Sequence, residues 1–225
     1  VLIFIMIINT DTNLFGSFSK KAGNVGCLFF NTAFKENNIN AIYKSFSVVN
    51  IHDAIDAAKC LKFSGFAVSM PFKTEIIQYL DEYNDIVKKT NSCNTVIIID
   101  SKLMGYNTDY MAVKSYLSDY FSTITLDKKT LYILGNGSYS GTVQVCCDEL
   151  DIKFKIITRK IWSDIDSIRN SIVFNCTPVE QINLDSSNNY INCINTSETG
   201  SVLAKKQSTI QYELYTKTTN TSQTS

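Results

Sequence analysis

Two charged residues stand where apolar, strand-like segments open into loops. Lys73 ends the stretch AVSMPFK, and Asp109 ends the stretch GYNTD. A lysine and a carboxylate held together can exchange a proton with a substrate hydroxyl, and the single histidine, His52, reads as a solvated residue at a helix start. Taken singly, Lys73 and Asp109 are explained more simply as solvated charges in the first turns of helices. The two motifs together, with Asn94 between them in the chain, favour one site.

A second candidate site follows the strand-like run LYIL, where the sequence continues as GNGSYSG. Gly135 permits a tight turn, and Gly137 lets the backbone approach a pyrophosphate at the N-terminus of the next helix. Ser140 stands where a third small residue, usually glycine, completes the fingerprint, so the motif alone also fits a turn without a ligand. The next strand ends in Arg159 and Lys160, which suit the 2′-phosphate of NADP better than the ribose hydroxyls of NAD.

The amino-acid composition limits which other classes of protein function are consistent with the chain. The chain has 225 residues, of which 44% are hydrophobic and 19% charged, with 21 basic and 21 acidic residues. No net charge attracts nucleic acid or an anionic membrane, so small-molecule chemistry is favoured. The seven cysteines show no CxxC spacing, which is typical of reduced thiols in a cytoplasmic protein and not of a disulfide framework. The N-terminal run VLIFIMII is too short to span a membrane and is expected to form a buried strand.

Apolar periodicity predicts strands and helices in alternation, which is typical of an α/β fold with parallel sheets. The expected strands cover 2–8, 42–48, 65–70, 94–99, 131–135, 153–159, 171–177 and 190–195. The expected helices cover 25–37, 53–63, 74–83, 108–121, 140–150 and about 200–215. The polar stretch STITLDKK after residue 121 is expected to mark a domain junction, and the polar tail 217–225 is expected to be disordered.

The order and spacing of these motifs resemble the shikimate dehydrogenase family over roughly residues 6–216. The segments that carry the resemblance are AVSMPFK, SCNTVI, GYNTDYMAV, the glycine turn and NCTPV. The segments KKAGNVGCLFFNTAF and QSTIQYELYT are more similar to its divergent shikimate dehydrogenase-like branch. The resemblance implies a substrate-binding α/β domain over 1–112, a shortened Rossmann-like NADP-binding domain over 113–198, and a helix over 199–216 that returns to the first domain.

The resemblance also implies an activity: NADP-dependent, reversible oxidation of shikimate or a related hydroxy acid to the 3-dehydro ketone. This reaction belongs to the chorismate pathway of aromatic amino acid biosynthesis. The implied protein is cytoplasmic, a monomer or homodimer, and without nucleic-acid or membrane partners.

The same resemblance assigns roles to individual residues. Lys73 and Asp109 face each other across the substrate as an acid–base pair, and such a pair titrates as a unit. The substrate-binding positions are Asn24, Gly26, Ser69, Asn94 and Gln207, with Gln211 one helical turn further on. The cofactor-binding positions are Gly135, Gly137, Ser138, Arg159, Asn175, Thr177 and Pro178. No metal site is implied.

Several positions depart from the family pattern. The family carries a pair of serines that bind the substrate carboxylate where this chain has Asn24 and Gly26, and Asn24 also fits a helix N-cap. The segments 159–175 and 194–200 are short, and the customary C-terminal helix is missing after Tyr215. Two alternatives therefore stay open: a catalytically impaired or non-catalytic protein that binds the hydroxy acid, and a regulatory domain of the kind fused to transcription factors in quinate metabolism. No DNA-binding motif supports the second. We expect shikimate itself to be a poor substrate.

Overall fold

The structure is a computed structural model that describes residues 8–123 and 130–221, with side chains described up to residue 217. All but the last residue of the strand predicted at 2–8 and most of the predicted junction STITLDKK therefore lie outside the described residues. The chain forms two compact units: Val1–Lys88, Ser92–Thr108 and Ser208–Ser225 make up the first, and Lys89–Asn91 and Asp109–Gln207 the second. The units thus divide between Thr108 and Asp109, whereas the resemblance implies a boundary after residue 112.

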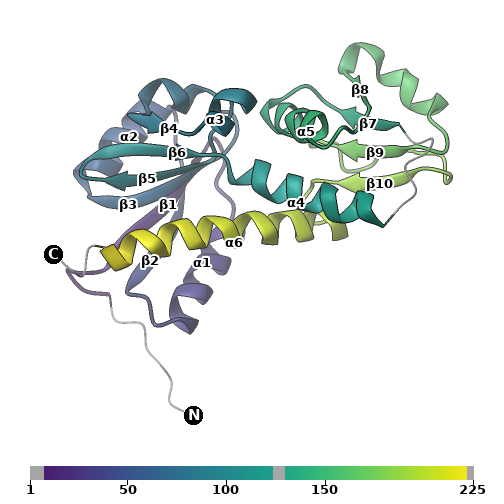
Figure 1. Cartoon of the computed structure of the whole chain (residues 1–225). Helices are drawn as coiled ribbons and strands as arrows, with labels where there is room; N and C mark the ends of the chain where they lie inside the picture. Colours follow the sequence, from purple (N-terminus) through teal and green to yellow (C-terminus); the bar gives the residue numbers. More distant parts are fainter. Residues whose placement is uncertain (1–7, 124–129, 222–225) are drawn as a thin grey trace. The chain divides into compact units, whose positions relative to one another are not determined.

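The first unit is built on a six-stranded sheet with the strand order β2-β1-β3-β5-β6-β4 (Figure 1). Its strands are β1 (Asn13–Ser19), β2 (Ala41–Ser47), β3 (Phe63–Val68), β4 (Glu82–Tyr83), β5 (Thr95–Ile99) and β6 (Lys102–Tyr106). The helices of this part of the chain are α1 (Val25–Glu36), α2 (Ile51–Cys60), the 3₁₀ helix η1 (Glu75–Tyr79) and α3 (Asp85–Thr90). β1 pairs in parallel with β2 and β3, and β5 pairs antiparallel with β3 and β6.

Each face of this sheet has its own apolar cluster. Phe18 and Phe66 lie in the cluster that includes Ile55 of α2 and Ile76 of η1. On the opposite face, Phe15 lies in the cluster formed with α1 and with the C-terminal part of α6 (Glu198–Thr221). Thr95 of β5 lies on this second face, where its hydroxyl accepts a hydrogen bond from Gln211 of α6.

β1 is a strand that the sequence analysis does not predict. Its sequence NLFGSFS lacks a strict apolar alternation because both faces are covered: Phe15 is 1% exposed on one face and Phe18 4% exposed on the other. Such a pattern is expected of a strand with parallel neighbours on both sides. Gly16 suits the position because a Cβ there would stand 2.8 Å from the carbonyl oxygen of Lys44.

The segment 74–83 does not form the single helix that the sequence predicts. The backbone becomes extended at Leu80, and the Asp81 N–H donates to the Leu103 carbonyl oxygen at 3.0 Å. The Asp81 carboxylate in turn accepts a hydrogen bond from the Leu103 N–H at 2.7 Å. Pairing with β6 therefore ends the helical segment after Tyr79 and starts β4.

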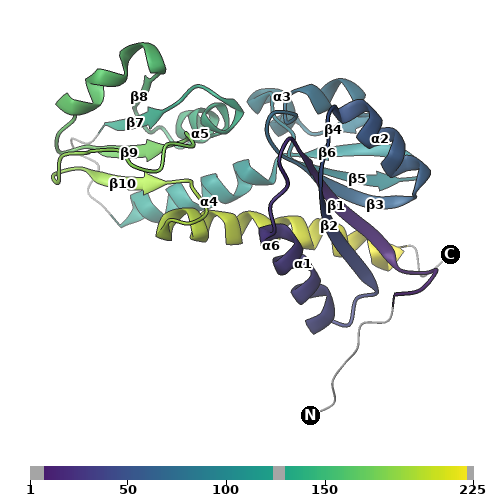
Figure 2. The same cartoon turned by 180° about the vertical axis from the view of Figure 1, so that it is seen from behind.

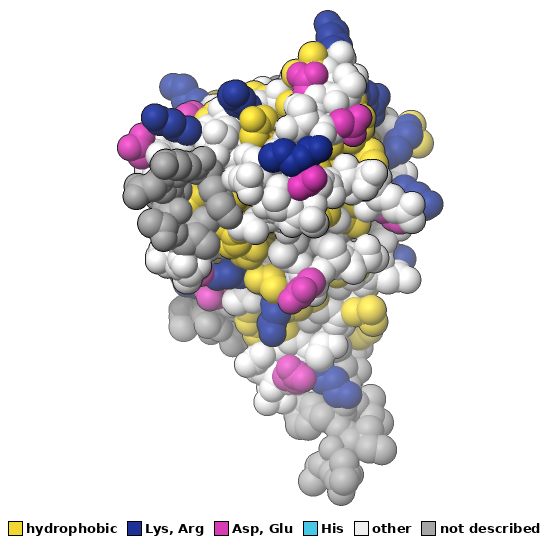
Figure 3. Space-filling view, turned by 90° about the vertical axis from the view of Figure 1, so that its right-hand side faces the viewer, with side chains coloured by type: hydrophobic (Ala, Val, Ile, Leu, Met, Phe, Trp, Pro, Cys, Tyr) yellow, Lys and Arg dark blue, Asp and Glu magenta, His cyan; other side chains and the backbone are white. Residues whose placement is uncertain are grey.

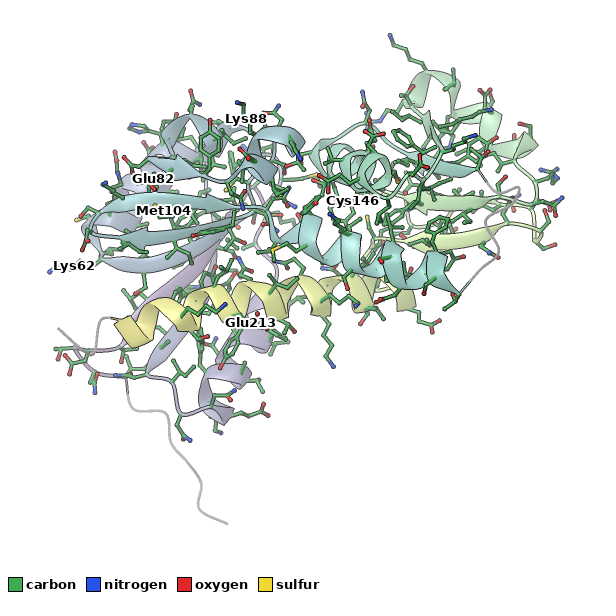
Figure 4. All side chains as sticks on the ribbon, in the orientation of Figure 1. Lys62, Glu82, Lys88, Met104, Cys146 and Glu213 are labelled. Atoms are coloured by element: carbon green, nitrogen blue, oxygen red, sulfur yellow. The ribbon has the colours of Figure 1, made fainter. Side chains whose placement is uncertain are left out.

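The second unit contains a fully parallel four-stranded sheet with the order β10-β9-β7-β8 (Figure 2). Its elements are α4 (Thr108–Ser122), β7 (Leu131–Leu134), α5 (Ser138–Glu149), β8 (Phe154–Ile157), the 3₁₀ helix η2 (Arg159–Ser167), β9 (Ile172–Asn175) and β10 (Asn189–Asn192). Cys146 of α5, labelled in Figure 4, donates its thiol to the Tyr110 carbonyl oxygen of α4 at 3.6 Å. The α/β class with parallel sheets is thus confirmed.

The remaining features of the fold are the end of the last helix, the lack of a membrane-spanning helix among the described residues, and the distribution of surface charge. α6 continues to Thr221, five residues into the tail predicted to be disordered, and residues 222–225 lie outside the described part. No helix among the described residues is both long and apolar enough to cross a membrane. On the face shown in Figure 3, basic and acidic side chains are interspersed, in keeping with 21 residues of each sign.

Candidate active site

Lys73 lies in the turn that joins β3 to η1. The Phe72 side chain anchors this turn in the core at 4% exposure, and the Phe72 N–H donates to the carbonyl oxygen of Ser69 at 2.9 Å. The carbonyl oxygen of Lys73 accepts a hydrogen bond from the Cys93 N–H at 2.8 Å. This bond holds Lys73 beside the start of β5, next to the residue that precedes Asn94.

The Cys93 thiol is an ionisable group whose pKa responds to the charge of Lys73. Burial raises the pKa of Cys93 to about 12, while backbone hydrogen bonds and the charge of Lys73 act in the opposite direction. A thiol with such a pKa stays protonated and inert near neutral pH. Cys93 is therefore not a candidate for proton transfer in this turn, and the Lys73 side chain is half-buried.

Asn94 is held in a defined orientation. Its Oδ1 accepts hydrogen bonds from the Thr108 N–H at 2.8 Å, the Thr108 hydroxyl at 3.0 Å and the Thr95 hydroxyl at 3.1 Å. Because a backbone N–H only donates, the atom that faces it must be the amide oxygen. The Asn94 amino group donates to none of the described residues and so faces away from this network with its donors available to a ligand.

The network around Asn94 extends through buried side chains to α6. Gln211 donates from Nε2 to the Thr95 hydroxyl at 2.9 Å and to the Tyr215 hydroxyl at 3.0 Å. Thr95, Thr108, Gln211 and Tyr215 are at most 2% exposed. Buried networks of this kind rigidify a site when every member is satisfied. The last helix therefore supports the motif residues through Gln211, which belongs to the first unit.

A row of hydroxyl groups, interrupted at Ala67, crosses the same face of the sheet. The strand registers align Ser45 of β2 with Ser17 of β1, Ser17 with Ala67 of β3, and Ala67 with Thr95 of β5. Residues aligned in this way point to the same face of a sheet. Sequence reasoning missed this row because it depends on strand register, and β1 itself is not predicted.

Asp109 belongs to the second unit and stands in the first turn of α4, directly after Thr108. Tyr139, in the first turn of α5, is half-buried, and desolvation of its phenol raises the pKa well above the ordinary value. The negative charge of Asp109 raises the Tyr139 pKa further. Tyr139 thus remains a neutral phenol near the Asp109 carboxylate, a neighbour that no sequence motif indicates.

Asn24 and Gly26 lie at the start of α1. Asn24 is the N-cap residue, but its side chain makes no capping hydrogen bond and is exposed. Gly26 lies against the ring of Tyr43, with 3.0 Å between the ring Cε1 and a Cβ built on the glycine. The other predicted substrate residues also occupy defined places: Ser69 is exposed after β3, and Gln207 is half-buried in the part of α6 that belongs to the second unit.

The glycine turn has the geometry of a phosphate-binding loop. Gly135 has a φ of +102°, and a Cβ there would stand 2.9 Å from Cγ2 of Thr177. Gly137 is the N-cap of α5, and no atom lies within 4 Å of a Cβ built on it. Ser140 replaces the third glycine without disturbing the turn, because its hydroxyl donates to the Gly135 carbonyl oxygen at 2.8 Å. Ser138 opens α5 and is half-buried. The residues present thus fit a dinucleotide pyrophosphate at the helix N-terminus.

Arg159 stands beside this turn. The Gly135 N–H donates to the Ile157 carbonyl oxygen at 2.8 Å, which places the end of β8 next to the glycine turn. Arg159 follows two residues later and is exposed, as is Lys160. Arg159 has no ion-pair or hydrogen-bond partner among the described residues, so its guanidinium is available to an anion. No carboxylate occupies the end of β8.

The loop after β9 lies at the point where the chain order of the parallel sheet reverses, because β8 and β9 flank β7 on opposite sides. Ligands of open parallel sheets bind at such a switch point. Asn175 shapes this loop by accepting from the Thr177 N–H at 2.9 Å and the Thr177 hydroxyl at 2.7 Å, and by donating to the Val179 carbonyl oxygen at 3.0 Å. Pro178 is exposed within the loop. The predicted cofactor residues thus gather at one edge of the second sheet.

The described residues contain no group of three or more histidine, cysteine, aspartate and glutamate side chains that could hold a metal ion. Two cysteines of the second unit, one buried and one half-buried, are also poor metal ligands as they stand. Burial raises the pKa of Cys147 to about 12 and that of Cys176 well above its ordinary value, so both remain thiols.

Comparison with known proteins identifies the family that this architecture resembles. Residues 25–96 match the family described as the shikimate dehydrogenase substrate binding domain. The chain is 31% identical over 167 residues to a shikimate dehydrogenase (NADP(+)) of Clostridium beijerinckii, covering 66% of this chain and 61% of that protein. It is 37% identical over 114 residues to a shikimate dehydrogenase-like protein of Haemophilus influenzae, covering 51% of this chain and 42% of that protein. The chain therefore spans about half the length of the curated relatives it matches.

A solved structure agrees with these sequence matches at the level of the fold. The structure of a shikimate 5-dehydrogenase-like protein superposes with a TM-score of 0.78 at 24% identity, and covers 93% of both chains. The resemblance to the shikimate dehydrogenase family, with an N-terminal substrate domain and a Rossmann-like domain, is thus confirmed.

Proposed function

We propose that this protein is an NADP-dependent oxidoreductase of the shikimate dehydrogenase-like type. It reversibly oxidises shikimate or a related hydroxy acid to the 3-dehydro ketone, with Lys73 and Asp109 as the acid–base pair. The observation that carries the proposal is the orientation of Asn94. Three internal donors occupy its amide oxygen, and its amino group is left to a ligand beside the turn that holds Lys73.

The roles of the residues follow from the requirements of alcohol oxidation. Loss of a hydride from a secondary alcohol needs a base that takes the hydroxyl proton. In this chain that base is Lys73 together with Asp109, and Asn94 holds a substrate hydroxyl by donating a hydrogen bond to its oxygen. NADP, when bound, supplies the nicotinamide that accepts the hydride. Gly135, Gly137 and the loop of Asn175 would hold it at the edge of the second sheet, and Ser138 lies in the first turn of α5.

We assign the preference for NADP over NAD to Arg159. Its guanidinium is exposed at the end of β8, where an NAD-preferring site places a carboxylate. The name of the Clostridium beijerinckii relative also specifies NADP(+). Arg159→Ala should weaken NADP binding about ten- to a hundred-fold and leave NAD binding nearly unchanged, since hydrogen bonds to a charged group contribute about 1.5–3 kcal/mol. Titration of both cofactors against the wild type and this variant, with Arg169→Ala as the matched control, tests the assignment. Equal weakening of NADP and NAD would contradict a contact to the 2′-phosphate.

The substrate is a hydroxy acid for which shikimate itself is a poor representative. The two serines that the family uses to bind the carboxylate are replaced by Asn24 and Gly26, and the loss of a donor to a carboxylate costs about ten- to a hundred-fold in affinity. A wild-type kcat/KM for shikimate of about 10⁴ M⁻¹s⁻¹ or above, typical of metabolic enzymes, would contradict this preference.

Nicotinamide fluorescence separates this function from a non-catalytic hydroxy-acid binder. NADPH bound in the second unit should show enhanced fluorescence that NADP displaces, and the hydroxy acid should bind to the NADP-loaded protein. Binding of a hydroxy acid without any binding of NADP or NADPH would instead indicate the non-catalytic binder.

A further inference from the structure

Both backbone groups of Gly135 are tied to neighbouring elements. The Gly135 N–H donates to the Ile157 carbonyl oxygen of β8, and the Gly135 carbonyl oxygen accepts from the Ser140 hydroxyl of α5, each at 2.8 Å. No other donor among the described residues reaches this carbonyl oxygen. The orientation of the peptide group that follows Gly135 therefore depends on one side-chain hydroxyl.

A second side chain fixes the direction of that hydroxyl. Ser140 is 0% exposed, and the amide of Gln144, one helical turn further along α5, lies 3.1 Å from the Ser140 oxygen. Because a carbonyl oxygen only accepts, the single proton of the Ser140 hydroxyl is given to Gly135. The Gln144 atom that faces the hydroxyl must then be the amino group Nε2, which donates. Donation thus runs from Gln144 to Ser140 and from Ser140 to Gly135.

This relay determines where the next backbone donor points. The peptide bond after Gly135 is trans, and in a trans peptide the C=O and the following N–H lie antiparallel in one plane. Since the Gly135 carbonyl is directed at Ser140, the N–H of Asn136 is directed away from it. Asn136 is exposed, and neither its N–H nor that of Gly137 has an acceptor among the described residues. Two backbone donors are therefore presented just before α5.

We propose that Ser140 and Gln144 are positioning residues for cofactor binding. Their relay of hydrogen bonds holds the peptide group after Gly135 so that the Asn136 N–H donates to the pyrophosphate of NADP. Ser140 thereby performs a task at the third position of the glycine fingerprint that glycine itself cannot perform. This inference rests on the proposed function, because it assumes that a dinucleotide binds at the glycine turn.

Ser140→Gly is the sharpest test, because it completes the usual glycine fingerprint and removes the hydroxyl in one change. It should weaken NADP binding about three- to ten-fold in calorimetric titration, the usual net contribution of one hydrogen bond. Ser140→Ala, which avoids a glycine inside the helix, should show the same loss. NADP binding by either variant that is as tight as in the wild type would overturn the proposal.

A nucleotide without a pyrophosphate separates a local effect on the turn from general damage to the second unit. Adenosine 2′-monophosphate carries the 2′-phosphate alone, so it should bind the wild type and both Ser140 variants alike. Equal losses of this nucleotide and of NADP would overturn the proposal. In turnover assays the variants should raise the KM for NADP and leave kcat unchanged, because the hydroxyl contacts no reacting atom.

Thr142→Val is the matched control. It removes another fully buried hydroxyl of α5, one that donates at 3.1 Å to the Ser138 carbonyl oxygen within the same helix and not to the turn. This variant should bind NADP like the wild type. A loss equal to that of Ser140→Ala would overturn the proposal, because any buried hydroxyl of α5 would then have the same effect.

Gln144→Met tests the relay, since it removes the amide and keeps the length of the side chain. Alone it should weaken NADP binding by a smaller factor than Ser140→Ala. In the Ser140→Ala background it should have no further effect, because no hydroxyl is left to orient. Additive losses in the double variant would show that Gln144 acts independently and would overturn the relay.

The outcomes separate this inference from the proposed function. If the wild type binds NADP and the Ser140 variants bind it equally well, the inference is wrong and the proposed function stands. If the wild type binds neither NADP nor NADPH, the proposed function fails and the inference fails with it.

Discussion

In Asn94 and Lys73, one part of the residue makes structural hydrogen bonds and another part is left for the proposed chemistry. The carbonyl half of the Asn94 amide satisfies three donors inside the first unit, and the amino half is directed away from them. The backbone of Lys73 is tied to β5 through Cys93, so its position does not depend on its side chain. Removal of the Lys73 side chain should therefore affect chemistry without loss of the fold.

Lys73→Ala should lower dehydrogenase activity by about 10²–10⁴-fold, the usual contribution of a general acid or base. The melting temperature should stay within the range of the wild type, because the hydrogen bond from Cys93 is made by the backbone. Asp109→Asn should also lower the rate strongly, since the pair shares the proton transfer. Lys88→Ala, a change at an exposed lysine labelled in Figure 4, is the control and should retain full activity. Near wild-type turnover by Lys73→Ala would show that the site assignment is wrong.

The sequence predicts some of these residues better than others. Lys73, Asp109 and Asn94 stand in short contiguous motifs, so their types and spacing are visible in the chain. Thr95 and Gln211 act through a contact between segments far apart in sequence. Their roles depend on strand register and on the packing of α6, which local patterns do not encode.

At the scale of elements, the turn from β7 to α5 combines two glycines with different constraints. Gly135 has a φ of +102° and a close neighbour in Thr177, whereas Gly137 has a φ of −94° and no atom within 4 Å of a Cβ. The first glycine is required by the backbone. The second has no structural requirement for glycine, and the open space beside it is in keeping with the proposed pyrophosphate site.

Gly135→Ala should lower the free energy of unfolding by about 1–3 kcal/mol, because alanine is strained at this φ. Gly137→Ala should change the free energy of unfolding by less than about 0.5 kcal/mol but should weaken NADP binding, since a methyl group would stand between the backbone and the pyrophosphate. Urea unfolding and NADPH fluorescence measured on both variants distinguish the two effects. Unchanged NADP affinity in Gly137→Ala would contradict a pyrophosphate at this turn.

A cluster of charges joins α5 to its neighbours. The Glu149 carboxylate accepts hydrogen bonds from Lys114 at 2.7 Å, from Lys89 at 3.1 Å and from the Tyr110 hydroxyl. These bonds, with that of Lys114 the strongest, lower the Glu149 pKa from the ordinary value of 4.5 to about 2. The folded state therefore favours the charged carboxylate more than the unfolded chain does.

Because folding lowers the Glu149 pKa, the stabilisation of the folded state by the Glu149 carboxylate depends on pH in one direction. The stabilisation is fully present above pH 4.5 and is lost as the pH falls toward 2. Glu149→Gln should therefore lower the melting temperature near pH 7, and the difference from the wild type should shrink between pH 4.5 and 2. Glu213→Gln, at an exposed position of α6 labelled in Figure 4, is the control. A difference that stays constant with pH would contradict the role of the carboxylate.

Elements were predicted from sequence where periodicity was strong, and missed where pairing decided the structure. Helices α1, α2, α4 and α5 and strands β7 and β8 lie close to their predicted ranges. β1 was missed because a strand buried on both faces lacks alternation, and 74–83 was assigned to one helix although Asp81 pairs with Leu103 of β6. Tertiary pairing overrode local preference in both cases.

At the scale of the whole molecule, the residues of the proposed site belong to both units. The first unit contributes Lys73, Asn94 and the row of hydroxyl groups, and the second contributes Asp109 and the glycine turn with Arg159. The α/β class and the family resemblance follow from the sequence because the motifs keep their order along the chain. The boundary between the units does not, since it falls inside α4, between Thr108 and Asp109, where the helical pattern is continuous.

The central claim is hydride transfer from a hydroxy acid to NADP that depends on Lys73. Its most direct test is the formation of NADPH from NADP with shikimate, quinate and related cyclic hydroxy acids, in the wild type and in Lys73→Ala. The account predicts that the wild type forms NADPH with at least one of these acids, faster with NADP than with NAD, and that Lys73→Ala forms about 10²–10⁴-fold less. A wild type that binds NADP but forms no NADPH with any of them, or an equally active Lys73→Ala, would contradict it.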